Sequence, residues 1–121
     1  NLRVGTATRW GKAFKKDLIE TREGMNIRIG GVELTVLHTP GHTEGAQCFL
    51  TGDTLITGDT LFPGACGRCD LPGGDEKKMA ASLKRLSEMD ENIKVYAGHA
   101  YGEASSSTIG QEKRSNPFMK F

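Results

Sequence analysis

The 121-residue sequence has few cysteines, no long apolar segment and almost no net charge, and each of these absences excludes a class of protein. Three cysteines are too few for a disulfide scaffold, so we expect reduced thiols and a cytoplasmic location, or a mitochondrial one for a longer parent protein. No run approaches the roughly eighteen apolar residues of a membrane span, so we expect no membrane partner. A net charge of +1 gives no reason to expect nucleic acid as a partner.

The sequence also lacks an initiating Met and an apolar signal core, so we expect a partial chain. Its length is that of one small domain, and we predict a single domain over residues 1–121. Leu, Ile, Val and Phe together number 25 of 121 residues, which is enough for a modest hydrophobic core.

Charge is distributed unevenly along the chain. Residues 1–30 carry seven Lys and Arg against three Asp and Glu, whereas residues 31–75 carry one Arg against six acidic residues. Ordinary surface variation is one interpretation. The other is that the acidic, glycine-rich middle of the chain holds a cation. A metal ion is then the natural candidate, because carboxylates and imidazoles are its usual ligands.

The apolar pattern of the first half predicts two strand pairs. Residues 24–37 alternate between apolar and polar types on either side of Gly30-Gly31, which suits a two-residue hairpin turn. Residues 46–50 and 54–57 form a second apolar pair joined by a Gly-Asp turn. Residues 58–74 are dominated by glycine and proline and keep no period, so we expect a long functional loop.

The second half predicts helices around one further strand. The pattern indicates a helix over residues 75–90 that Asp75 can cap, and then a strand over residues 93–97. Thr108 begins a capping box for a short helix that ends before Pro117.

A further helix is expected over residues 7–20, where apolar residues fall on one helical face. The order of elements is then helix, strands, helix, strand, helix. This order is typical of an α/β chain whose core is built largely on a sheet.

Three chemically active side chains follow predicted strands. His42 lies in the turn after the first hairpin, while Asp59 and His99 follow the strands over residues 54–57 and 93–97. If these strands share one sheet and point the same way, the three side chains converge on one sheet edge. Two imidazoles and a carboxylate at a strand edge are a typical metal-site set. Each of the three also has an ordinary structural explanation when it is taken alone.

Two nearby residues of the same types are interpreted as structural. Asp53 and Asp59 stand in near-identical Thr-Gly-Asp-Thr-Leu repeats, but Asp53 lies in a short turn, where Gly-Asp is ordinary turn chemistry. His38 lies on the strand that leads into the His42 turn, which favours a supporting role over metal ligation.

Four short motifs follow one another along the chain: LHTPGHTEG at residues 37–45, TGDTLF at 57–62 with CGR at 66–68, VYAGHAY at 95–101, and STIGQEKRSNP at 107–117. Together they resemble the metallo-β-lactamase superfamily, and within it the branch of glyoxalase II (hydroxyacylglutathione hydrolase) and persulfide dioxygenase. Each motif is weak alone, but the four occur in the family's order. The resemblance covers most of the chain from about residue 24 onward.

The resemblance implies half of an αββα sandwich, with a mixed, mostly antiparallel sheet flanked by helices and one or two metals at its rim. It implies zinc, with iron as the alternative. It assigns His42 to the first metal, Asp59 to a bridging and catalytic position, and His99 to the second metal. In such a hydrolase a metal-bound hydroxide attacks the thioester carbonyl of a glutathione conjugate. Arg68 and Tyr101 match positions that hold the glutathione part of the substrate.

The superfamily signature His-x-His-x-Asp-His is absent from the sequence, which resembles the second half of the family's fold. We therefore expect an incomplete hydrolase site in this chain alone. We also expect a homodimer, or association with a missing N-terminal half, because an uncovered sheet favours association. Two other functions stay open: a persulfide dioxygenase-like protein with one iron, and a non-catalytic binding or assembly module.

Cys66 and Cys69 form a C-x-x-C motif in the glycine-rich loop. A zinc knuckle needs a second ligand pair and a thioredoxin-like motif needs a strand-loop-helix setting, and the sequence shows neither. The motif therefore favours a substrate loop over a redox pair. We expect both thiols to be reduced and unnecessary for folding.

Overall fold

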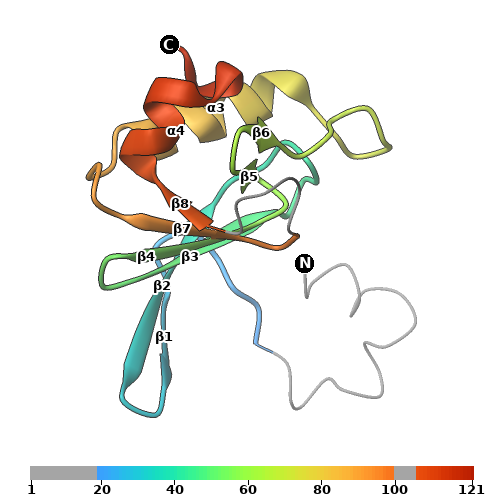
Figure 1. The fold of residues 1–121 in the computed structure, drawn as a ribbon. Helices are drawn as coiled ribbons and strands as arrows, with labels where there is room; N and C mark the ends of the chain where they lie inside the picture. The colour runs from blue at the N-terminus through green and yellow to red at the C-terminus, as the bar shows by residue number, and fades with distance from the viewer. Residues whose placement is uncertain (1–18, 100–105) are drawn as a thin grey trace.

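The computed structural model describes residues 19–99 and 106–121 (Figure 1). Its main sheet contains β1 (Asn26–Ile29), β2 (Val32–His38), β3 (Gln47–Thr51), β4 (Thr54–Gly58), β7 (Lys94–Ala97) and β8 (Ser106–Thr108). They stand in that order across the sheet, and all neighbours are antiparallel except β4 and β7, which are parallel. The prediction of an α/β fold with a mixed, mostly antiparallel sheet is confirmed.

Glycine turns join the first four strands in pairs, as the sequence pattern predicts. Gly30 and Gly52 have φ angles of 61° and 57°, a left-handed conformation that glycine adopts at little steric cost. The register of the first hairpin pairs Ile29 with Val32 across a two-residue turn. Both predicted strand pairs are therefore present, with boundaries within a residue or two of those expected.

Three helical segments complete the described fold: α3 (Glu76–Ser87), α4 (Ile109–Ser115) and the 3-10 helix η3 (Pro117–Met119). The Asp75 side chain caps α3 by accepting from the Lys78 amide at 3.0 Å. Thr108 and Gln111 form a reciprocal capping box at α4. The predicted helix over residues 75–90 ends three residues early, because the chain turns after Ser87 to reach β7.

The loop expected over residues 58–74 contains a small hairpin, so that prediction is corrected. Its strands are β5 (Leu61–Phe62) and β6 (Ala65–Cys66). Strands of two residues are too short to show a period of two in the sequence. Most of the helix expected over residues 7–20 lies outside the described residues, and residues 19 and 20 are not helical.

Two buried polar side chains of the last helical region hold this small hairpin in place. The Asn116 amide donates to the Phe62 and Ala65 carbonyls at 3.3 and 3.0 Å, and also to the Glu112 carboxylate at 2.9 Å. The same Glu112 oxygen accepts from the Gly64 amide at 2.9 Å. The hairpin is thereby fixed to α4, so its position depends on contacts about 50 residues away in sequence.

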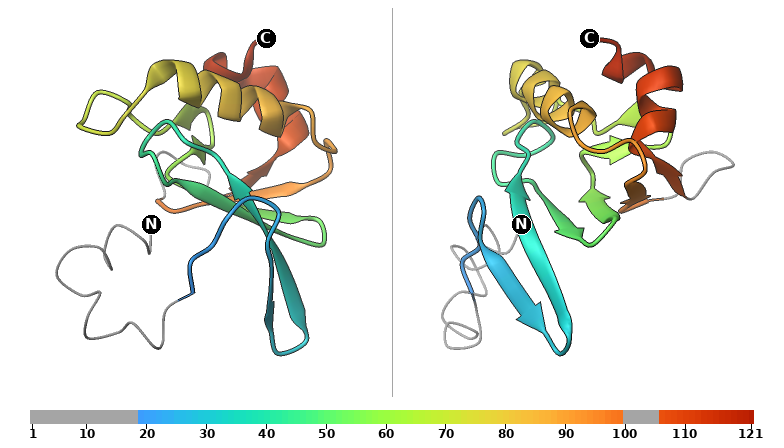
Figure 2. Two further views of the ribbon diagram at one scale, coloured as in Figure 1. Left: turned by 180° about the vertical axis from the view of Figure 1, so that it is seen from behind. Right: turned by 90° about the vertical axis from the view of Figure 1, so that its left-hand side faces the viewer.

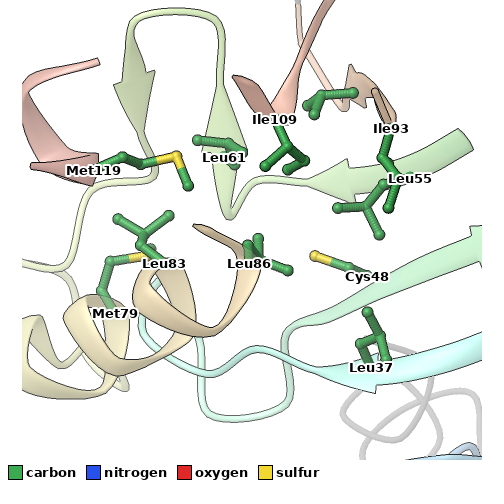
Figure 3. Packing of buried hydrophobic residues seen from close by; sticks show 11 residues of the cluster. Leu37, Cys48, Leu55, Leu61, Met79, Leu83, Leu86, Ile93, Ile109 and Met119 are labelled. Atoms are coloured by element: carbon green, nitrogen blue, oxygen red, sulfur yellow. The ribbon is translucent and has the colours of Figure 1, made fainter. Parts of the chain in front are cut away.

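The hydrophobic core lies between one face of the sheet and the helices (Figures 1 and 3). Met79, Leu83 and Leu86 of α3 follow one another at helical spacing and are buried, as the sequence pattern predicts. They pack with the following sheet, loop and C-terminal residues: Leu37, Cys48, Leu55, Leu61, Ile93, Val95, Ile109 and Met119. The core therefore joins the sheet to α3, α4 and η3 on a single side.

The opposite face of the sheet carries no helix within residues 19–99 and 106–121 (Figure 2). One row of paired residues crosses four strands on this face: Val36, Phe49, Ile56 and Tyr96. Val36 is buried, whereas Ile56 and Tyr96 are 41% and 45% exposed. No helix in the described part of the chain is long and apolar enough to cross a membrane.

Candidate functional site

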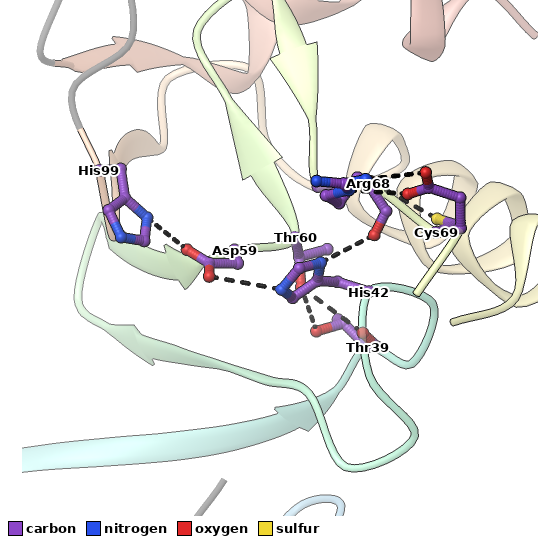
Figure 4. A network of polar contacts seen from close by, with 9 residues as sticks. Thr39, His42, Asp59, Thr60, Arg68, Cys69 and His99 are labelled. Atoms are coloured by element: carbon purple, nitrogen blue, oxygen red, sulfur yellow. Dashed lines mark hydrogen bonds and ion pairs between the residues drawn. The ribbon is translucent and has the colours of Figure 1, made fainter. Parts of the chain in front are cut away.

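Three strands of the sheet run in the same direction and bring the predicted site residues to one edge. β2 and β4 are each antiparallel to β3 and so parallel in direction to each other, and β7 is parallel to β4. His42 follows β2, Asp59 follows β4 and His99 follows β7. The convergence expected from the sequence is present (Figure 4).

Asp59 stands between the two histidines. Its Oδ1 lies 2.7 Å from His99 Nδ1, and its Oδ2 lies 3.5 Å from His42 Nε2. Side-chain exposure is 21% for His42, 35% for Asp59 and 55% for His99, so a ligand can reach the group from solvent. One carboxylate therefore faces two imidazoles in an accessible position.

The His42 imidazole is oriented by the backbone of a neighbouring loop. Its Nδ1 lies 2.8 Å from the Arg68 carbonyl oxygen. A carbonyl only accepts, so Nδ1 carries the hydrogen, and in the neutral ring Nε2 is left as the acceptor that faces Asp59. A ring N–H held by a carbonyl is the usual arrangement around a metal-binding histidine, because it fixes the tautomer and the ring orientation.

Glycines allow the loops that carry these side chains to pack closely. A Cβ at Gly67 would lie 1.9 Å from the Asp59 carbonyl oxygen and 3.1 Å from His42 Cβ. A Cβ at Gly98 would lie 3.0 Å from Asp59 Oδ1. The site therefore tolerates no larger residue at Gly67 without backbone movement.

Arg68 lies in this loop, but its guanidinium turns to a residue of the same loop. Its Nε and Nη2 contact the two oxygens of Asp70 at 2.7 and 2.9 Å. This hydrogen-bonded pair lowers the pKa of Asp70 to about 2. Arg68 also borders a cavity of about 470 Å³, lined on its apolar side by Met79, Leu83 and Phe118. This volume lies within the range of about 300–1,000 Å³ that is usual for small-molecule pockets.

The two loop cysteines line the same cavity and are free thiols. Burial raises the pKa of both Cys66 and Cys69. The interpretation of a substrate loop over a redox pair stays a prediction.

The other residues considered in the sequence analysis are not part of the group formed by His42, Asp59 and His99 in the described residues. Tyr101 lies outside the described residues. His38 is the last residue of β2, and its Nε2 lies 2.8 Å from the Glu44 carbonyl oxygen. Asp53 lies in the exposed turn between β3 and β4, as expected for a structural aspartate.

The side chains at this site are of the types that bind metal ions. Two imidazoles and a carboxylate are accepted by both zinc and iron. In residues 19–99 and 106–121, however, no group of three His, Cys, Asp or Glu side chains is arranged to hold a metal ion. Asp59 and His99 contact each other directly instead. The chemistry of the set fits a metal, while the arrangement seen here pairs the donors with one another.

Sequence reasoning missed the buried polar residues that support the site. Thr39, Thr57 and Thr60 are fully buried beside His42 and Asp59, and Glu112 and Asn116 hold the hairpin that leads into the Arg68 loop. The signal for the threonines was present, because each stands within three residues of a predicted ligand. The local sequence pattern does not predict the burial of Glu112 and Asn116, because their burial depends on tertiary contacts.

Several curated relatives are similar to most of this chain, among them GloC and PksB. Hydroxyacylglutathione hydrolase GloC of Haemophilus influenzae is 40% identical over 110 residues, which cover 88% of this chain and 50% of GloC. The probable polyketide biosynthesis zinc-dependent hydrolase PksB of Bacillus subtilis is 36% identical over 106 residues, covering 87% of this chain and 47% of PksB. The chain spans about half the length of the curated relatives it matches.

Several solved structures share the fold, among them ETHE1 and TTHA1623. ETHE1 from Myxococcus xanthus has a TM-score of 0.79 and 37% identity, with 82% of this chain and 44% of that chain covered. TTHA1623, solved in a di-iron-bound form, has a TM-score of 0.72 and 42% identity, with 84% of this chain and 48% of that chain covered. The names of the relatives thus include a zinc-dependent enzyme and an iron-bound protein.

The family profile described as "Metallo-beta-lactamase superfamily" matches residues 7–99, a stretch that includes His42, Asp59 and His99. Members of this superfamily bind metals such as zinc or iron. The sheet topology, the residues gathered at its edge and this match agree with one another, and the chain belongs to the metallo-β-lactamase superfamily.

Proposed function

We propose that this chain contributes to the metal site of a glyoxalase II-like thioester hydrolase, with His42, Asp59 and His99 as metal ligands. The observation that carries the proposal is the position of Asp59 between two imidazoles at one sheet edge. The similarity to GloC supports hydrolysis of a glutathione thioester as the reaction. The similarity to PksB supports zinc as the metal, and we propose one or two zinc ions.

Each residue of the proposed metal site has a role that follows from its chemistry. Zinc, when bound, supplies Lewis acidity that polarises a thioester carbonyl and lowers the pKa of a water molecule. Asp59 faces both histidines, so its two oxygens can serve two ligand positions. The Arg68 carbonyl keeps the His42 lone pair turned toward Asp59. This backbone contact fixes the first ligand without using the Arg68 side chain.

Arg68 and Tyr101 are proposed to hold the glutathione part of the substrate. The Arg68 side chain is 62% exposed, and its guanidinium already binds one carboxylate, that of Asp70, through two hydrogen bonds. A substrate carboxylate can compete for the same donors. The neighbouring cavity of about 470 Å³ has the volume for the remainder of a small thiol conjugate.

The exposed apolar row of the sheet is proposed to pack against an N-terminal half of the same fold. Ile56 and Tyr96 stand 41% and 45% exposed at the centre of the sheet. The curated relatives are about twice as long as the matched region, and a second half of that length would cover this face. The three free cysteines support a reducing compartment, and we propose the cytoplasm.

The experiment compares two aspartates from the near-identical repeats. The full-length protein is assayed for bound metal and for hydrolysis of S-lactoylglutathione. Hydrolysis is monitored by the release of thiol. We expect Asp59→Asn to lower kcat/KM by about 100-fold or more and to reduce bound metal. Asp53→Asn is the matched control and should stay within about twofold of wild type, because its side chain is exposed in a turn. Equal activity of wild type and Asp59→Asn would contradict the proposal.

A persulfide dioxygenase is the second candidate, favoured by the structural similarity to ETHE1. It predicts one iron per protein and oxygen consumption with glutathione persulfide. Hydrolysis of S-lactoylglutathione without oxygen consumption would exclude it. A full-length protein with neither activity and no bound metal would instead favour a non-catalytic module.

A further inference from the structure

Four fully buried side chains near the site are not used by the proposed reaction. Two of them, Thr39 and Thr60, are drawn close to His42 and Asp59 in Figure 4. The four form what we call the threonine–cysteine cluster: Thr39, Cys48, Thr57 and Thr60. Thr39 directly follows β2, Cys48 lies in β3, Thr57 lies in β4, and Thr60 follows Asp59. The cluster therefore joins the ends of the strands that carry His42 and Asp59.

The cluster is connected by hydrogen bonds through the core. Thr39 Oγ1 lies 3.1 Å from Thr60 Oγ1 and 3.3 Å from Cys48 Sγ. Burial raises the pKa of Cys48 to about 11, so its thiol keeps the hydrogen, which it donates to the Thr57 carbonyl at 3.8 Å. One consistent direction of donation runs from Thr60 to Thr39 to Cys48 to the Thr57 carbonyl.

Thr57 extends the same cluster to the strand that leads to His99. Its hydroxyl donates to the Leu61 carbonyl at 2.7 Å and lies 3.3 Å from the Tyr96 carbonyl. Tyr96 belongs to β7, three residues before His99. All three strands that carry the site are therefore tied by side-chain hydroxyls or the Cys48 thiol.

Packing alone does not explain three buried threonines at these positions. Valine has nearly the same shape as threonine and carries no hydroxyl to remove from water. A buried hydroxyl is favourable only where its hydrogen bonds are made. The hydroxyls of Thr39 and Thr60 meet each other, so their contact fixes two loops relative to each other.

Thr60 also connects to the loop that orients His42. Its carbonyl accepts from the Gly67 amide at 3.2 Å, and the next residue, Arg68, holds His42 Nδ1. Asp59 is the residue immediately before Thr60. A shift of Thr60 would therefore move the Asp59 carboxylate and the support of His42 together.

We propose that Thr39 and Thr60 are positioning residues, whose hydroxyl contact sets the separation of Asp59 from His42 and so the metal affinity of the site. The inference rests on the proposed metal site. Removal of the hydroxyl should loosen the ligands without removing any of them. Outer contacts of this kind typically change metal affinity by about 10- to 100-fold.

The test measures zinc affinity of the full-length protein by competition with a chelating dye, for wild type, Thr60→Val and Thr60→Ser. We expect Thr60→Val to weaken zinc binding by about 10-fold or more, and Thr60→Ser, which keeps the hydroxyl, to stay within about threefold. Thr108→Val is the matched control, because it removes a capping hydroxyl at α4, away from the site. It should lower stability and leave zinc affinity unchanged.

The outcomes separate this inference from the proposed function. Wild type that binds no zinc would overturn the proposed metal site and this inference with it. If wild type and Thr60→Val bind zinc with the same affinity, the positioning role of Thr60 is overturned and the proposed metal site is not. Equal losses in Thr60→Val and Thr108→Val would also overturn it, because they would show a general effect of stability. If Thr60→Val does not fold, Thr39→Val and Thr39→Ser carry the same test from the other end of the contact.

Discussion

Replacement of Gly67 by alanine is expected to be among the most damaging single-methyl changes at the site. The added Cβ would lie 1.9 Å from the Asp59 carbonyl oxygen, whereas real Cβ contacts essentially never fall below 3.0 Å. The shortfall is about 1.1 Å, and the opposing atom belongs to backbone and cannot rotate away. Extra methyl groups in well-packed regions cost about 1–3 kcal/mol, and this contact should reach the upper end, about 3 kcal/mol.

The assay is urea unfolding of the full-length protein, monitored by circular dichroism. A loss of about 3 kcal/mol lowers the midpoint by roughly 1.5 M when the m value is about 2 kcal/mol/M. Gly31→Ala is the matched control, because a Cβ there meets nothing within 4 Å and its φ is not left-handed. We expect the control to lie within about 0.5 kcal/mol of wild type. A Gly67→Ala protein as stable as the control would refute the close packing of this loop on Asp59.

Three further predictions concern regions around the site. Arg85 lowers the pKa of Glu23 to about 2 by hydrogen bonding, so stabilisation by this pair is complete above about pH 4.5 and is lost as the pH falls toward 2. The Glu23 and Arg85 side chains are 49% and 44% exposed, so Glu23→Gln should cost at most about 1 kcal/mol at pH 7 and nothing near pH 2, measured by unfolding across pH. Asn116→Leu should cost about 3 kcal/mol in urea unfolding, because it leaves buried carbonyls and a carboxylate without their donor. Replacement of both Cys66 and Cys69 by serine should change the melting temperature by less than about 3 °C, and a larger loss would indicate a structural role for the thiols.

The sequence predicts those parts of the fold that depend on local chemistry. The hairpin turn at Gly30 and the caps at Asp75 and Thr108 are local features, and all lie where expected. The meeting of Asp59 with His99 was predictable because each follows a strand and the two strands share one direction. The order of the elements and the geometry of a sheet are enough to predict this contact.

The features that were missed depend on contacts distant in sequence. The β5–β6 hairpin is held by Asn116, 51 and 54 residues away from its partners, so no pattern near residue 62 reveals it. Thr39 and Thr60 lie 21 residues apart, and only the folded sheet shows that their hydroxyls meet.

The parallel pair of β4 and β7 has a consequence for how the molecule folds. Asp59 and His99 are 40 residues apart, and their contact closes a loop that contains the β5–β6 hairpin and all of α3. Contacts of such separation form late and slowly, because chain entropy must be lost before they contribute. Next to Asp59 and His99 in the sequence, the Gly98 amide donates to the Gly58 carbonyl at 2.7 Å, at the end of β7. Amide exchange at Gly98 would therefore report each opening of this crossover, and every such opening separates the carboxylate from its second imidazole.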